Sequence, residues 1–166
     1  MIPGNNKKFM QVQFPVSALH YPEKYTGRNR VLDIKSSYEF TFMRYLDNNT
    51  NVISYHYEEV PIQYASPIDQ GRMHRYWVDF WMRYINVEGK ESQSLVELKP
   101  FYETQKPPLR EHQSDAVKKQ LIETYLVNQA KFSAAFEYAR RNSMRFTILT
   151  ERELFYFPGF SAKYEK

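Results

Sequence analysis

Three polar side chains in two strand-like runs have the residue types and the spacing for metal-assisted hydrolysis. Glu97 and Lys99 are two residues apart in SLVELKP, so in a strand both side chains leave the same face. Asp79 lies in MHRYWVDFWMRY, where an acidic residue is unfavourable and, once buried, needs a partner or a metal ion. Adjacent strands would let Asp79 and Glu97 share one hard divalent cation, Mg²⁺ or alternatively Mn²⁺, with a backbone carbonyl and waters completing the coordination.

Lys99 supplies the remaining chemical component of such a site. It could hold or deprotonate the water that attacks a phosphorus atom, and its charge could stabilise the negative charge that develops. Taken by themselves, Glu97 and Lys99 are better explained as an ion pair on a solvated strand face, which contributes little to stability. Their conjunction with Asp79 favours a catalytic site.

Glu39 adds a fourth polar group, carried by a predicted helix. Ser36 or Ser37 can cap a helix over YEFTFMRYLDNN, which asparagine and aspartate residues end near positions 47 to 51. Glu39 shares the helical stripe of Phe42, Met43 and Leu46 and would therefore face the core. A solvated glutamate at the edge of that stripe is an equally common arrangement.

The two strand-like runs belong to a predicted antiparallel meander of three strands. Aromatic and β-branched residues predict a strand, or a strand pair bent at Pro61, over 52–64 and another strand over 73–84. The polar turn NVEGKES connects the second of these to SLVELKP.

Two helices are predicted after the meander, from Ser114 to about Tyr125 and from Asn128 through QAKFSAAFEYARRN. The strand RFTIL follows, and Thr150 with Glu153 forms a capping box for a short last helix. The order of elements is that of one mixed α/β domain.

The prolines and glycine of residues 1–24 predict an irregular N-terminal arm, followed by a single domain over 25–166. The 166 residues include no cysteine, which excludes disulfides, thiolate zinc sites and cysteine nucleophiles. The net charge of +4 permits a polyanionic partner without requiring one. We expect no signal peptide, no membrane span and no small-molecule cofactor.

The order helical Glu, strand Asp and then Glu-x-Lys resembles the PD-(D/E)xK nuclease superfamily, with VD and ELK at the motif and Val78 in place of its proline. A narrower resemblance runs from about Tyr25 to Phe160, to the head-completion nucleases of T-even-type tailed phages. It is carried by YTGRNR, KSSYEFTFMRYLDNN, RYWVDFWM, VELKPFYETQKPP, VNQAKFSAAFEYAR and RFTILTE.

This resemblance implies a restriction-endonuclease-like core, with a mixed central sheet flanked by helices, and Mg²⁺-dependent hydrolysis of DNA phosphodiester bonds. Glu39, Asp79 and Glu97 would be metal ligands, and Lys99 would be the catalytic lysine. It further implies virion assembly after genome packaging, with DNA ends as one target and head or neck proteins at the portal vertex as partners. The location would be the host cytoplasm, or alternatively the virion.

Several residues around the motif admit both a functional and a structural interpretation. We predict Lys131 to be solvated, and Trp77 and Trp81 to pack in the core beside Asp79 rather than stack on bases. Seven basic residues that precede the Glu39 helix or flank the motif strands are predicted phosphate contacts: Arg28, Arg30, Lys35, Arg72, Arg75, Lys106 and Arg110.

Two other functions remain compatible with the sequence. One is a structural head or neck completion protein that uses a nuclease-like scaffold and cuts nothing. The other is a transposon or repair endonuclease on the same core. Against the latter, the narrower resemblance extends into TQKPP and RFTILTE, which the chemistry does not require.

Overall fold

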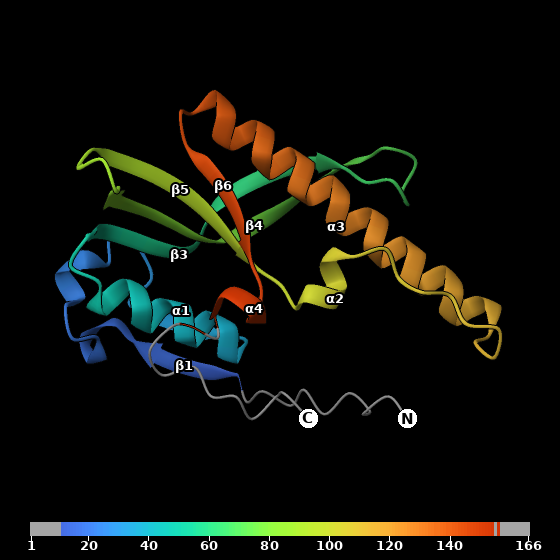
Figure 1. The fold of residues 1–166 in the computed structure, drawn as a ribbon, viewed down its shortest axis with the longest axis horizontal. Coiled ribbons are helices and arrows are strands. Elements are labelled where there is room, and N and C mark those ends of the chain that lie inside the picture. The colour runs from blue at the N-terminus through green and yellow to red at the C-terminus, as the bar shows by residue number, and fades with distance from the viewer. Residues whose placement is uncertain (1–10, 155, 157–166) are drawn as a thin grey trace.

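A four-stranded sheet is the centre of the computed structural model, which describes residues 11–154 and 156. The strands β3 (Val52–Ala65), β4 (Met73–Ile85) and β5 (Glu91–Leu98) form the predicted antiparallel meander. β6 (Arg145–Leu149) lies parallel to β5, so the sheet order is β3-β4-β5-β6 (Figure 1).

The irregularity predicted for β3 lies at Glu58 and Glu59 rather than at Pro61. These two residues intervene between the pairs Tyr57–Phe80 and Val60–Val78, so β3 carries an extra residue there, and Glu58 has a φ of +49°. Pro61 continues the strand, which is tolerated because β3 is an edge strand.

The predicted first helix is confirmed as α1 (Ser37–Asn48), with Ser36 as its N-cap. The Ser36 hydroxyl accepts the backbone N–H of Glu39 at 3.1 Å. At the end of the domain, Thr150 and Glu153 form the predicted capping box of α4 (Glu151–Leu154), with Thr150 N donating to Glu153 Oε2 at 2.7 Å.

The helical region after β5 differs from its prediction in one respect. After the short helix α2 (Phe101–Thr104), a single helix α3 spans Asp115–Arg141 without a break. Asn128, predicted to cap a second helix, is a buried residue within α3, because tertiary packing outweighs its weak preference for a cap. The N-terminal half of α3 projects beyond the sheet (Figure 1).

The N-terminal segment also differs from its prediction over residues 11–24, since the predicted arm contains regular structure there. β1 (Val12–Pro15) pairs antiparallel with β2 (Val31–Ile34), and two 3-10 helices, η1 (Val16–Ala18) and η2 (Pro22–Lys24), connect them. Val16 and Leu19 are buried in the core, so this segment is part of the domain. Residues 1–10 of the predicted arm lie outside the described residues.

Two apolar layers cover opposite faces of the sheet. Val96 of β5 packs in a cluster with Phe42 and Leu46 of α1, whereas its neighbour Leu95 packs with Ala135 of α3. Because successive residues of a strand point to opposite faces, α1 and α3 lie on opposite sides of the sheet (Figure 1). In the described part of the chain, no helix has the length and apolar character needed to span a membrane.

Candidate active site

The backbone pairing of β4 with β5 ends at Phe80 and Val96. At the next position of β4, the side chain of Asp79 takes the place of a backbone hydrogen bond between the two strands. Asp79 Oδ2 accepts the backbone N–H of Leu98 at 2.7 Å. On the other side of β4, Asp79 lies opposite the bulge of Glu58 and Glu59. The bulge and the end of pairing therefore open the sheet around a single carboxylate, an arrangement often found next to active sites.

Glu97 and Lys99 follow at the end of β5. Glu97 is 4% exposed, and its Oε1 lies 3.5 Å from Nζ of Lys99. No donor among the described residues reaches Glu97 Oε2, although the atom is buried. The backbone N–H of Lys99 donates to the carbonyl of Leu149 in β6 at 3.0 Å, so the parallel strand holds the lysine in place. The structure thus brings the three predicted residues Asp79, Glu97 and Lys99 together.

The carboxylates of Asp79 and Glu97, called here the carboxylate pair, carry strongly perturbed acidities. Burial and the charge of Glu97 raise the pKa of Asp79 well above its usual range. Burial also raises the pKa of Glu97, against the opposing charges of Lys99 and Lys131. Burial alone would lower the pKa of Lys99, but the carboxylate pair outweighs that effect and raises it. Two buried acids without full compensation are typical of a functional site.

Glu39 is 9% exposed and faces inward, as the helical spacing predicts. Its Oε2 accepts the hydroxyl of Tyr57 at 2.7 Å and the backbone N–H of Lys35 at 2.8 Å. The charge of Glu39 contributes to the raised pKa of Asp79, so the two carboxylates are electrostatically linked. Glu39 therefore stabilises the start of α1 in this arrangement, and its role as a metal ligand stays a prediction.

The carboxylate pair fits a hard divalent cation. It offers two buried carboxylates, one oxygen of which has no hydrogen-bond donor within residues 11–154 and 156. Across those same residues, no group of three or more His, Cys, Asp or Glu side chains is arranged to hold a metal ion. A cation here would have two carboxylate ligands, with backbone carbonyl and water oxygens in the remaining positions, as Mg²⁺ commonly has.

Lys131, predicted to be solvated, is half-buried beside the site instead. Its Nζ lies 5.4 Å from the ring centre of Tyr76 and 5.7 Å from that of Tyr64. Tyr76 also donates its hydroxyl to the Lys131 carbonyl at 3.0 Å. Burial and the charge of Lys99 lower the pKa of Lys131. The partial burial of Lys131 could have been predicted from the apolar stripe of α3, because the stripe places one side of this helix against the sheet.

The two tryptophans of the motif strand differ from each other. Trp81 is partly buried as predicted, stacks on His56 with ring centres 4.8 Å apart, and donates to Gln93. Trp77 is 48% exposed, so the prediction of core packing is wrong for this residue. Trp77 points away from its neighbours Tyr76 and Val78, which pack in the α3 cluster, whereas Trp81, beyond Asp79, packs against that cluster.

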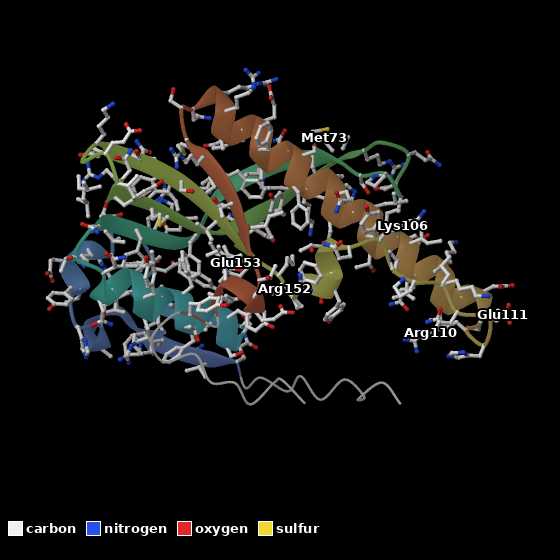
Figure 2. All side chains as sticks on the ribbon, in the orientation of Figure 1. Met73, Lys106, Arg110, Glu111, Arg152 and Glu153 are labelled. Carbon is white, nitrogen blue, oxygen red and sulfur yellow. The ribbon has the colours of Figure 1, made fainter. Side chains whose placement is uncertain are left out.

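The seven predicted phosphate contacts are all exposed. Lys35 is already engaged with Glu58, with Nζ 2.6 Å from Oε1. Lys106 and Arg110 belong to the loop between α2 and α3, which runs beside the projecting half of α3, and Arg110 lies near the N-terminal end of that helix (Figure 2). Their contacts with DNA stay a prediction.

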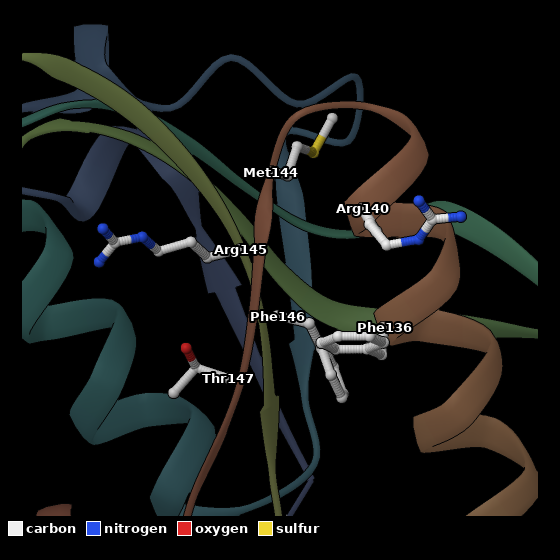
Figure 3. Close-up of a pocket in the computed structure, with 6 residues that line it drawn as sticks. All are labelled: Phe136, Arg140, Met144, Arg145, Phe146 and Thr147. Atoms are coloured by element: carbon white, nitrogen blue, oxygen red, sulfur yellow. The ribbon is translucent and has the colours of Figure 1, made fainter.

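A separate hollow lies between the end of α3 and β6 (Figure 3). Phe136, Arg140, Met144, Arg145, Phe146 and Thr147 line it. None of the four predicted catalytic residues takes part, so the hollow is distinct from the carboxylate pair.

The mixed sheet between helices and the acidic pair with its lysine define a nuclease domain of the restriction-endonuclease-like class. A family model described as TnsA-like endonuclease N terminal matches residues 49–151, a range that contains Asp79, Glu97 and Lys99. The chain is also 33% identical over 131 residues to the Head completion nuclease of Enterobacteria phage T4, covering 77% of this chain and 84% of that protein. No solved structure matches. The chain therefore belongs to the TnsA-like endonuclease family, and its resemblance to the phage head-completion nucleases is confirmed.

Proposed function

We propose that this protein is a metal-dependent DNA endonuclease of a tailed phage that acts on the genome after packaging. The observation that carries the proposal is the buried pair Asp79 and Glu97, with an unpaired Glu97 oxygen and Lys99 alongside, in a chain of an endonuclease family. A buried, incompletely compensated acidic pair destabilises a fold, so its presence is best explained by a ligand that it holds.

Asp79 and Glu97 would hold Mg²⁺, or alternatively Mn²⁺, and Glu39 is the further predicted ligand. When bound, the cation supplies positive charge that polarises a phosphate and makes a water more acidic. Asp79 is fixed for this task by the N–H of Leu98, which keeps its second oxygen available. The backbone of Asp79 and of Glu97 lies in neighbouring strands, so neither needs to move to form the pair.

Lys99 acts as the cationic partner of the reacting phosphodiester. As an ammonium 3.5 Å from Glu97, it can turn its remaining N–H groups toward the attacking water or a phosphate oxygen. Its charge stabilises the negative charge that develops as the water attacks phosphorus in line with the leaving oxygen. Its backbone bond to Leu149 fixes the main chain from which the side chain extends, and Glu97 lies beside its ammonium group, which favours catalysis by positioning.

The role in virion assembly is supported by the similarity to the Head completion nuclease of phage T4, because the match covers most of both chains. By that similarity we propose trimming of DNA ends at the portal vertex, in contact with head or neck proteins, in the host cytoplasm or in the virion. The name of the family model, which refers to Tn7, favours a transposon-type endonuclease as the second candidate. Cleavage of DNA ends without a sequence requirement would support the first function, and cleavage at one defined sequence the second.

The test is cleavage of linear, nicked and overhang-bearing DNA by the purified protein, in Mg²⁺ and in EDTA. We expect cutting that requires the metal and that Lys99→Ala abolishes. Lys90→Ala is the matched control, because Lys90 is an exposed lysine in the turn between β4 and β5. Absence of cutting by the folded wild-type protein, together with no Mg²⁺ binding by calorimetry, would favour a structural completion protein instead.

A further inference from the structure

The side of α3 that faces the sheet carries a lysine among apolar residues. Val127, Ala134 and Ala135 pack in the cluster that α3 forms with the sheet. These residues stand four positions before, three after and four after Lys131, so Lys131 lies on the same side of the helix. A lysine in such a place is uncommon, because burial disfavours its charge unless an anion compensates it.

Lys131 has aromatic neighbours but lacks a carboxylate partner. Its Nζ lies 5.4 Å from the ring centre of Tyr76 and 5.7 Å from that of Tyr64, and both tyrosines are buried. Within residues 11–154 and 156, no Asp or Glu lies at ion-pair distance from Lys131. The rings attract the ammonium group without neutralising it. Its positive charge is therefore available to an anion.

Glu97 and Lys99 point to the side of the sheet that α3 covers. Leu95 of β5 packs with α3, whereas Val96 and Leu98 pack with α1. Because side chains alternate along a strand, Glu97 points toward α3, as Leu95 does. The ammonium group of Lys99 lies 3.5 Å from Glu97 Oε1. Both residues thus approach the helix that carries the unpaired lysine.

The charges on the helix and on the sheet act on each other. Burial raises the pKa of Glu97, and the charges of Lys99 and then Lys131 lower it. Tyr76 is a common neighbour, since it donates its hydroxyl to the Lys131 carbonyl at 3.0 Å. After burial, the charges of Glu97 and Asp79 contribute most to the raised pKa of Tyr76. Lys131 is therefore within electrostatic reach of the carboxylate pair without being bonded to it.

We infer that Lys131 is a second lysine of the active site, which donates from α3 to a non-bridging oxygen of the scissile phosphate while Lys99 acts from β5. The inference rests on the proposed nuclease function and adds a residue to its reaction. A phosphodiester carries one negative charge, and attack by a deprotonated water raises that charge to two. A divalent cation would balance the carboxylate pair, so the two lysines supply the positive charges that match the attacked phosphate. Lys131 keeps its proton throughout.

Three variants test the role of the Lys131 charge. Lys131→Met keeps an unbranched side chain among apolar neighbours, Lys131→Gln keeps a polar end, and both remove the charge. Single-turnover cleavage in Mg²⁺ should slow by roughly 100-fold in each. Lys131→Arg keeps the charge and should cut faster than both. Lys119→Met is the matched control, because Lys119 is exposed on the projecting half of α3 and should not affect cutting.

A second measurement tests contact with the phosphate itself. In the Lys99→Ala background, which we expect not to cut, DNA affinity can be measured in Mg²⁺. Adding Lys131→Met should weaken binding of ordinary DNA by roughly tenfold. The same change should not weaken binding of DNA in which the phosphate cut by wild type is replaced by a neutral methylphosphonate, because the charge that Lys131 contacts is already absent.

The outcomes separate this inference from the proposed function. Cutting at the wild-type rate by Lys131→Met and Lys131→Gln, or an equal loss of affinity for both DNAs, overturns the role of Lys131 and leaves the nuclease assignment standing. Thermal melting that shows neither uncharged variant to be folded would make Lys131 a structural residue and also overturn the inference. Absence of cutting by the folded wild-type protein rejects the nuclease and the inference together.

Discussion

Replacement of Asp79 by asparagine or by alanine should separate catalysis from stability. Both variants lose the charge with which Asp79 would hold the proposed cation, so cleavage should fall at least about 10³-fold in each. Asparagine keeps an oxygen for the N–H of Leu98, which donates to Asp79 at 2.7 Å. Alanine leaves that buried N–H without its acceptor, at a cost of about 1–3 kcal/mol.

Loss of the Asp79 charge should lower the rate of cleavage but should not lower the stability of the fold. Burial and Glu97 raise the pKa of Asp79, so the fold loses stability as pH rises and this carboxyl ionises. At pH 7 in EDTA, Asp79→Asn should therefore be at least as stable as wild type. Asp79→Ala should be less stable than Asp79→Asn by about 2 kcal/mol, or roughly 4–8 °C in Tm for a domain of this size.

Urea unfolding at pH 7 and pH 5 and thermal melting, all in EDTA, measure these differences, and the DNA cleavage assay measures activity. Asp79→Asn with wild-type cleavage would refute the active-site assignment. Equal Tm values for the asparagine and alanine variants would refute the energetic role of the bond to Leu98. A wild-type protein that is more stable than Asp79→Asn at pH 7 would show that the pair is not repulsive.

Three further predictions concern residues around the site and the N-terminal segment. Glu39→Gln keeps an acceptor for Tyr57, so the free energy of unfolding should change by less than about 1 kcal/mol. As a metal ligand, Glu39 should matter for activity, so cleavage by this variant should fall at least roughly tenfold. Unchanged cleavage would exclude that role. Gly27→Ala would place a Cβ against the Tyr25 hydroxyl and 2.6 Å from Glu59 Oε1, so urea unfolding should show a loss of about 1–3 kcal/mol, partly recovered by adding Tyr25→Phe. Burial raises the pKa of Tyr25 from 10.0 to about 12, although a hydrogen bond with the Tyr57 backbone lowers it, so the free energy of unfolding should fall between pH 10 and 12. Tyr25→Phe should reduce this fall by up to about 2 kcal/mol. The same alkaline profile in the variant would contradict the raised pKa of Tyr25.

The parts of the fold that sequence predicts well are those fixed by local chemistry. Ser36 and Glu39 give the start of α1 because a cap and its helix are neighbours in the chain. The meander follows from aromatic and β-branched runs separated by polar turns, and Thr150 with Glu153 identifies α4 for the same local reason. Asp79, Glu97 and Lys99 could be associated because adjacent antiparallel strands bring their ends together.

The features that sequence did not predict depend on distant contacts. Asn128 suggests a cap, yet packing of α3 on the sheet keeps the helix continuous through it. Pro15 and Pro22 suggest irregular chain, but Pro15 ends a strand and Pro22 begins a 3-10 helix, positions where a proline is tolerated. The exposure of Trp77 depends on which face of the β3–β4 hairpin α3 covers, and a residue pattern with aromatics on both faces does not contain that information.

The parallel pairing of β5 with β6 determines when an active molecule can arise during folding. Lys99 is hydrogen-bonded to Leu149, fifty residues later in the chain, and the intervening helix α3 supplies the packing for one side of the sheet. Closing so long a loop costs entropy that only the finished strand pair and helix recover, so this step comes late relative to the local hairpins. In a nascent chain whose β6 is still inside the ribosome, Lys99 lies on an unpaired strand end, and nuclease activity should appear only after synthesis has passed residue 149.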